Sequence, residues 1–268
     1  MRRILFVLVA VLGCVLGLAV AAGPANAATV NYVALGDSYS SGVGAGNYIS
    51  TSGSCDRSTS GYPYLWYQQH AVTSFKFVAC SGAKTTDVLA NQISAVTSST
   101  TLVSITIGGN DAGFSSVMQT CVLHSTSTCL STVATARDFV TRQLPARLTS
   151  TLQAIRQHAP GARIVVLGYP DLYDLSKSGS CIGLSTQDRT ALNSGADALD
   201  SALRAAVTAA ADRSIVYADV GGQFAGHVIC DSGSWLHSVD LLAISSSYHP
   251  TASGQKLGYQ PVFSRNTG

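Results

Sequence analysis

Five short apolar segments, distributed along the whole chain, constrain its fold more than any other feature of the sequence. They are rich in Val, Ile and Leu and lie at residues 32–35, 75–78, 102–107, 163–167 and 215–218. Apolar runs of this length are typical of parallel strands that are buried on both faces. The stretches between them are longer and more polar, so strands alternate with connections long enough to contain a helix.

Those connecting stretches have helical patterns. We predict helices at 62–70, 85–96, 131–158 and 186–211. Pro145 is expected to break or kink the third, because proline has no N–H to donate within a helix. The alternation of strand and helix predicts an α/β fold, a three-layer α/β/α sandwich around a five-stranded parallel sheet.

The first 27 residues have the pattern of a secretory signal. Arg2 and Arg3 precede an apolar run from 4 to 22, and an Ala-Asn-Ala sequence at 25–27 provides a cleavage site. An uncleaved membrane anchor and a lipoprotein signal ending at Cys14 are the alternatives. We therefore expect a signal peptide at 1–27, a single domain at 28–268 and a secreted, extracellular protein.

Charge and cysteine content narrow the class of protein further. The chain has 16 basic and 14 acidic residues, and removal of the leader would bring the two to equality. Without a basic tract, nucleic acid is not an expected partner. Six cysteines remain after the leader, and an even number in an exported chain indicates disulfides rather than a zinc site. Many pairings are possible, and the simplest one joins neighbours in chain order: Cys55–Cys80, Cys121–Cys129 and Cys181–Cys230.

Polar and glycine-rich motifs follow three of the predicted strands directly. They are Gly-Asp-Ser at 36–38, Cys-Ser-Gly-Ala at 80–83 and Gly-Gly-Asn-Asp at 108–111. The carboxyl ends of parallel strands meet at one edge of a sheet, where α/β folds place their sites. A serine hydroxyl, a backbone N–H and an asparagine amide can therefore converge there. Taken singly, each motif also fits an ordinary turn or helix cap.

A serine nucleophile needs a base, and the candidate bases are histidines. We expect surface positions for His70, His124 and His158, which lie in or beside helical segments. His227 and His237 stay open as candidates. His249 is preferred because Pro250 fixes the chain next to it and a helical pattern follows.

In this order, the motifs resemble those of the GDSL family of esterases and lipases, also called SGNH hydrolases. The resemblance extends from Gly36 to Pro250 and is strongest with the secreted bacterial lipases and phospholipases A1. It implies a flavodoxin-like fold with Ser38 as nucleophile and His249 as general base. It also implies an oxyanion hole made by the N–H groups of Ser38 and Gly82 and the side chain of Asn110.

Two positions depart from the family pattern. Tyr39 stands where the family has leucine, and Ser246 stands where the family has the aspartate of its catalytic triad. We therefore predict a Ser38–His249 dyad in which a backbone carbonyl near Ser246 orients the imidazole. The alternatives are that Asp240 or Asp231 reaches the ring from elsewhere in the fold.

The sequence thus predicts a serine esterase or lipase that hydrolyses carboxylic esters through an acyl-enzyme. Its substrate would be a small-molecule or lipid ester, including phospholipid acyl esters. We expect a monomer that contacts lipid surfaces transiently and uses no metal or cofactor. The alternatives are a carbohydrate acetyl esterase and a non-catalytic secreted binding domain.

Overall fold

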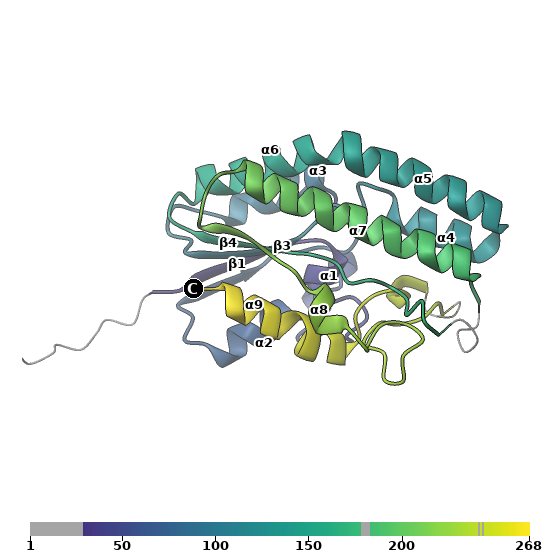
Figure 1. Ribbon diagram of the computed structural model, residues 1–268. Coiled ribbons are helices and arrows are strands. Elements are labelled where there is room, and N and C mark those ends of the chain that lie inside the picture. Colours follow the sequence, from purple (N-terminus) through teal and green to yellow (C-terminus); the bar gives the residue numbers. More distant parts are fainter. Residues whose placement is uncertain (1–28, 178–182, 241, 243) are drawn as a thin grey trace, which may run out of the picture.

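The computed structural model describes residues 29–177, 183–240, 242 and 244–268, and its centre is a parallel β-sheet (Figure 1). The strand order is β2-β1-β3-β4-β5, and every pairing is parallel. The strands are β1 (Asn31–Gly36), β2 (Ser74–Phe77), β3 (Leu102–Thr106), β4 (Arg163–Leu167) and β5 (Ile215–Ala218). Each overlaps a predicted segment, and the last two coincide with their predictions.

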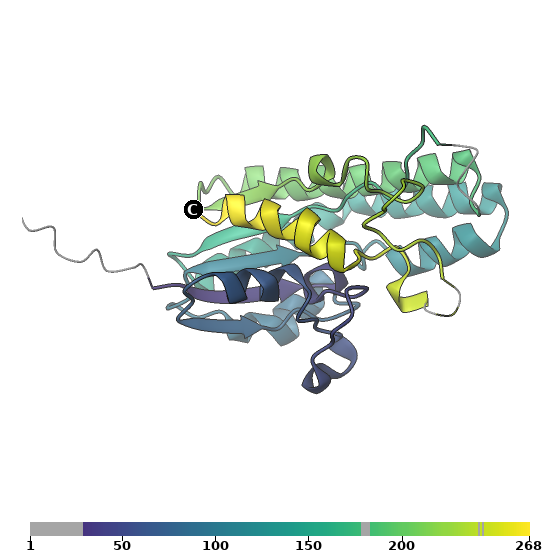
Figure 2. The same cartoon turned by 90° about the horizontal axis from the view of Figure 1, so that it is seen from below.

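Helices cover both faces of this sheet, which confirms the predicted three-layer sandwich. One face carries α2 (Tyr62–Gln69), α8 (Gly221–Phe224) and α9 (Gln260–Asn266), with α2 and α9 packed together (Figure 2). The other face carries α3 (Thr85–Asp87), α6 (Leu144–His158) and α7 (Thr186–Ala209). The core between the layers includes fully buried aromatic rings at Tyr32, Tyr62, Phe224, Tyr259 and Phe263.

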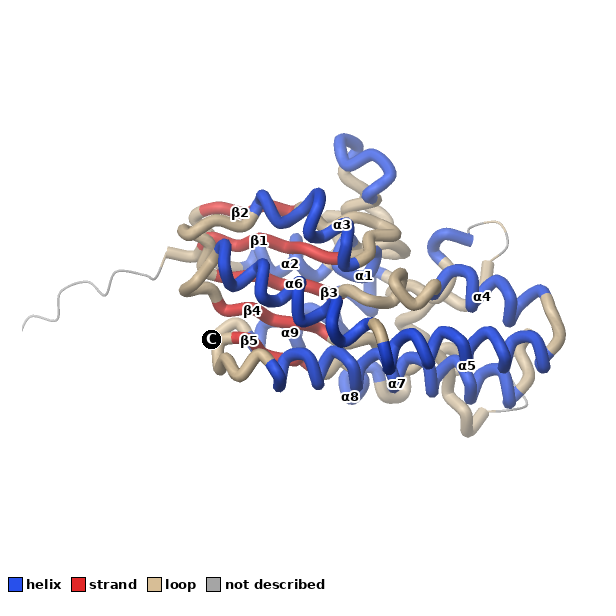
Figure 3. Tube along the Cα trace, turned by 90° about the horizontal axis from the view of Figure 1, so that it is seen from above, coloured by secondary structure: helices blue, strands red, loops and turns tan. Residues whose placement is uncertain are grey.

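Two helices, α4 (Phe114–Leu123) and α5 (Thr126–Arg142), extend beyond the carboxyl ends of the strands together with the first half of α7 (Figure 3). We call this group of three helices the helical overhang. The sequence pattern predicts no helix at 114–123 and predicts that the next one begins at 131, whereas α5 begins at Thr126. Pro145 behaves as expected: α5 ends at Arg142, and the proline occupies the first turn of α6.

The predicted helix at 85–96 is irregular in the structure. Only Thr85–Asp87 is α-helical, followed by a π-helical turn (Val88–Gln92) and a 3-10 turn (Ile93–Ala95). Shorter elements are α1 (Ser38–Ser41), 3-10 turns at Ser50–Cys55 and Ile244–Ser246, and a π-helical turn at Gly254–Tyr259. Within the described ranges, no helix is long and apolar enough to cross a membrane.

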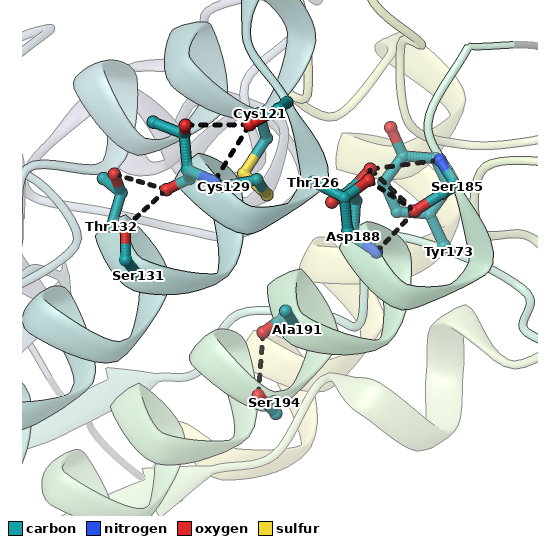
Figure 4. Close-up of a disulfide and its surroundings, with 12 residues drawn as sticks. Cys121, Thr126, Cys129, Ser131, Thr132, Tyr173, Ser185, Asp188, Ala191 and Ser194 are labelled. Carbon is teal, nitrogen blue, oxygen red and sulfur yellow. Dashed lines mark hydrogen bonds between the residues drawn. A yellow bond between two sulfur atoms is a disulfide. The ribbon is translucent and has the colours of Figure 1, made fainter.

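Two of the predicted disulfides are present, and each reinforces a different region. Cys55–Cys80 holds the loop after β2, whereas Cys121–Cys129 joins α4 to α5 at the distal end of the helical overhang (Figure 4). The third predicted pair, Cys181–Cys230, includes a cysteine that lies outside the described residues, as does the predicted signal peptide.

Candidate active site

Ser38 stands at the carboxyl end of β1, at the start of the short helix α1, and only 8% of its surface is exposed. The chain reaches it through Gly36, whose φ is +118°. A Cβ at this position would lie 2.3 Å from the Thr106 carbonyl oxygen, so no larger residue fits. The Gln92 side chain hydrogen-bonds both the N–H and the carbonyl of Gly36, at 2.7 and 2.9 Å. The turn that presents Ser38 is therefore held rigidly.

Asp37 is the N-cap of α1, and its carboxylate is buried with three hydrogen-bond donors around it. Tyr39 N–H and the Thr106 hydroxyl donate to Oδ1 at 3.0 and 2.7 Å, and the Tyr169 hydroxyl donates to Oδ2. Burial raises the pKa of Asp37 to about 6, and the hydrogen bonds from Tyr169 and Thr106 oppose the rise. These contacts give Asp37 a structural role beside the serine. The sequence contained no signal for the contribution of Tyr169.

His249 faces Ser38 across the site. Its Nε2 lies 2.8 Å from Ser38 Oγ, and the ring is buried, with 9% of the residue exposed. Burial lowers the pKa of His249 to about 4, and the neighbouring His237 acts in the same direction. The imidazole is therefore neutral at physiological pH, which leaves Nε2 available as a proton acceptor.

The loop that carries His249 is fixed by backbone pairing and by one buried tyrosine. His237 N–H donates to the His249 carbonyl, and Tyr248 N–H donates to the His237 carbonyl, both at 2.9 Å. Tyr248 adopts a left-handed φ of +65°, and the Tyr39 hydroxyl donates to its carbonyl at 2.6 Å. Tyr39, the residue at the position where the family has leucine, thus connects the serine turn to the histidine loop.

The second ring nitrogen of His249 meets a backbone carbonyl. Nδ1 lies 3.0 Å from the Ser247 oxygen, while the Ser246 carbonyl accepts from His249 N–H at 3.1 Å. Both carbonyls act to raise the pKa of His249, against the effect of burial. The closest partner of Nδ1 is therefore one residue beyond the position singled out from the sequence.

The two candidate carboxylates make other contacts. Asp240 accepts from Leu242 N–H at 2.9 Å, and its backbone N–H donates to the Ser247 hydroxyl. Asp231 pairs with Lys177 at 2.6 Å. In the part of the chain that the structure describes, no carboxylate hydrogen-bonds the His249 ring. Asp240 thus contacts Ser247 through its backbone N–H, while its carboxylate accepts from Leu242.

The loops after β2 and β3 converge on the serine turn. Cys80 N–H donates to the Gly36 carbonyl at 3.0 Å, and the Asn110 amide donates to the Ala83 carbonyl at 3.1 Å. Gly82 lies between these two anchors with a φ of +77°. Among the described residues, neither Gly82 N–H nor Ser38 N–H has a hydrogen-bond acceptor. Asn110 and Ser38 line the same cavity.

A salt-bridged aspartate ties these two loops together, a role the sequence did not reveal. Both oxygens of Asp111 accept from Thr85, from its N–H at 2.9 Å and its hydroxyl at 2.6 Å. Arg147 on α6 pairs with the same carboxylate at 3.4 Å. The Gly82 loop runs directly into Thr85, so Asp111 holds the loop containing Gly82 against the loop containing Asn110.

Two hollows adjoin the Ser38–His249 pair: Ser38 lines one and His249 lines the other. The inner cavity extends from Ser38 and Asn110 into the helical overhang, where apolar side chains of α4, α5 and α7 line it, among them Met118, Val133, Val140, Leu192 and Leu199. The outer groove lies on the other side of α4 and is lined by His249, Tyr248, Gln119, Val122 and Ile244, among others. The helical overhang thus supplies most of the apolar surface near the site.

Among the described residues, no other histidine hydrogen-bonds Ser38. His70, His124 and His158 are exposed, as expected. His227 stacks on Trp235, and His237 Nε2 contacts the Gly44 carbonyl oxygen at 2.8 Å. Over the described ranges there is no cluster of three His, Cys, Asp or Glu side chains suited to a metal ion.

The fold and the site together define the class: an α/β/α hydrolase with a serine and a histidine at the carboxyl edge of its sheet. The model of the GDSL-like lipase/acylhydrolase family matches residues 34–257, and the chain belongs to this family. It is a carboxylic ester hydrolase. The predictions of family, fold and enzyme class are confirmed.

Three relatives are similar over nearly their whole length. The chain is 52% identical to Lipase 1 of Streptomyces coelicolor, with 92% of this chain and 90% of the relative covered. It is also 52% identical to phospholipase A1 from Streptomyces albidoflavus NA297, whose crystal structure superposes with a TM-score of 0.85. The extracellular lipase from Streptomyces rimosus gives a TM-score of 0.84 at the same identity. Both comparisons cover 89% of this chain and 100% of the solved one.

Proposed function

We propose that the protein is a secreted lipase or phospholipase A1-type esterase that works through a Ser38–His249 dyad. The observation that carries this proposal is the 2.8 Å contact between His249 Nε2 and Ser38 Oγ in a buried site. The lipase and phospholipase A1 names of its relatives support a lipid ester as substrate. The apolar inner cavity favours an acyl chain over a polar sugar such as acetylated xylan.

In the first half-reaction, Ser38 Oγ attacks the ester carbonyl carbon while His249 Nε2 takes the hydroxyl proton. Nδ1–H donates to the Ser247 carbonyl, which fixes the tautomer that leaves Nε2 free to accept. The oxyanion that forms is stabilised by the N–H groups of Ser38 and Gly82 and by the Asn110 amide. His249 then gives its proton to the leaving alcohol as the C–O bond breaks, which produces an acyl-enzyme.

Water completes the reaction. It attacks the acyl carbon, His249 again accepts the proton, and collapse of the second tetrahedral intermediate releases the carboxylic acid and restores Ser38. No metal or cofactor has a step in this scheme. The carbonyl at Nδ1 orients the ring as a carboxylate would, but it offers less charge to the imidazolium that forms during each step.

The setting of the enzyme is part of the proposal. A signal peptide at 1–27 followed by a catalytic domain at 28–268 is consistent with the extracellular relative from Streptomyces rimosus. We propose a monomer, to be checked by sedimentation. Transient contact with lipid surfaces is supported by Leu123, Leu242 and Ile244, which are 66, 100 and 50% exposed, the first and last beside the outer groove. Co-sedimentation with phosphatidylcholine vesicles tests that contact.

The direct test of the chemistry is Ser38→Ala. The variant should unfold at the wild-type temperature within a few degrees, because the hydroxyl lies at a site and not in the core. Its hydrolysis of p-nitrophenyl butyrate and phosphatidylcholine should fall to background. Substantial residual turnover by a folded variant would refute the assignment of Ser38 as nucleophile.

A further inference from the structure

Helix α4 separates the inner cavity from the outer groove. Phe114 and Met118 line both of them. Val117 belongs only to the inner cavity, whereas Ser115 and Gln119 belong only to the outer groove. Residues three and four apart share a helix face, so one helix presents an apolar wall to the cavity and a mixed wall to the groove, where Val122 and Leu123 accompany the two polar residues.

The reacting atoms distinguish the two hollows. Ser38 and Asn110 line the inner cavity and His249 does not, while His249 lines the outer groove and Ser38 does not. In a tetrahedral intermediate on Ser38 Oγ, the oxyanion faces its donors and the leaving oxygen faces His249, which must protonate it. The acyl chain takes the remaining direction, away from His249.

From this geometry we infer that the inner cavity binds the acyl chain of the ester and the outer groove binds its alcohol. Small residues of α7 then set the chain length that the enzyme accepts. Gly195 lines the inner cavity, and a Cβ built there has a single neighbour within 4 Å, Val133 Cγ1 at 3.9 Å. A larger side chain at 195 would extend into the space that the acyl chain uses. This assignment rests on the proposed function.

The acyl arm is tested with Gly195→Leu on p-nitrophenyl esters of two to sixteen carbons. The ratio of kcat/KM for the twelve-carbon ester to that for the four-carbon ester should fall at least tenfold. Leucine is a better helix former than glycine, so the variant is expected to fold, and its thermal unfolding is measured alongside. Gly195→Ala should shift the same ratio in the same direction by a smaller factor, because its Cβ makes only an ordinary contact.

The matched control lies on the same helix. Ala191→Leu adds comparable bulk on α7, where the half-buried Ala191 lines a separate hollow between α5 and α7 that does not include Ser38. Its chain-length ratio should stay within twofold of wild type. An equal shift of the chain-length ratio in Gly195→Leu and Ala191→Leu would overturn the assignment of the inner cavity. So would an unchanged ratio in both Gly195 variants.

The alcohol arm is tested with Gln119→Trp, which narrows the outer groove. With octanoyl as the constant acyl group, the ratio of turnover on dioctanoyl phosphatidylcholine to turnover on methyl octanoate should fall at least fivefold, with the acyl-length ratio preserved. If Gln119→Trp instead changed the acyl-length ratio, the two hollows would be assigned the wrong way round. Failure of the proposed function looks different, because the wild-type protein would then hydrolyse none of these esters.

Discussion

The serine turn and the helical overhang meet at Ser38, but they are stabilised by different forces. At the turn, directional hydrogen bonds hold nearly every polar group, as in the two bonds from Gln92 to Gly36 and the three donors on Asp37. In the overhang, apolar side chains pack between helices and a disulfide closes the far end. Hydrogen bonds specify positions of atoms, whereas apolar packing specifies the shape of a space. In the proposed mechanism, the turn therefore governs the chemical step, and the inferred acyl cavity in the overhang governs which acyl chains are accepted.

Among the substitutions that distinguish the serine turn from the helical overhang, Asn110→Ala should have the largest effect on activity. Removing one donor from an oxyanion hole typically costs about 2.7–4 kcal/mol in the barrier. Asn110→Ala should therefore lower kcat by about 10² to 10³-fold. Because the defect lies in the chemical step, kinetics on esters of different chain length should show the same loss for each. A loss confined to long-chain esters would contradict the role of Asn110.

An intermediate effect is expected from the two disulfides. Removing Cys121–Cys129 by a double serine substitution frees the distal end of the overhang, and a loop of this size is worth about 2 kcal/mol. We expect a lower Tm and a loss of activity that grows with acyl chain length, about tenfold at twelve carbons. The double serine variant of Cys55 and Cys80 is the comparison.

The Cys55–Cys80 variant should behave differently because Cys80 stands two residues before Gly82. Loosening that loop disturbs the oxyanion donors, so kcat should fall by a similar factor for short and long esters. Identical chain-length profiles in the two double variants would show that the disulfides do not separate the two regions as described.

The smallest effect concerns pH. In the proposed mechanism His249 acts as a base only when neutral, and burial lowers its pKa to about 4, from an ordinary value of 6.5. Activity on a soluble ester should therefore persist as pH falls through 6.5 and decline only near pH 4. Ser246→Asp, which restores the carboxylate of the family pattern, should raise the pKa of His249 and move the acid limb upward. An acid limb near 6.5 in the wild-type enzyme would contradict the burial effect.

The sequence predicts the strands and the serine turn better than it predicts the helical overhang. The five strands and the motifs at their ends were recognisable because buried parallel strands and the turns after them leave strong local patterns. Gly36 illustrates this, since its left-handed φ and close approach to Thr106 admit only glycine. The residues that support the site from a distance, such as Gln92 and Tyr169, carry no such pattern.

The overhang was predicted least well. Helix α4 is rich in Ser, Thr, Val and Phe, which are weak helix formers, so its helicity depends on packing against α5 and on the disulfide. The inner cavity is a space between elements that lie far apart in the chain, so no motif marks it. The orienting carbonyl of Ser247 was likewise approximated but not located, because every residue has a carbonyl and only the fold selects one.

In the proposed mechanism, Ser38 Oγ is the nucleophile and His249 activates it. Incubation with a p-nitrophenyl alkylphosphonate followed by mass spectrometry tests this most directly. We expect one covalent adduct per molecule, on the peptide that contains Ser38, with activity lost in proportion to labelling. Labelling of His249→Gln should be at least 10²-fold slower, in line with typical general-base effects. An adduct on another residue, or equal labelling rates in the two proteins, would contradict it.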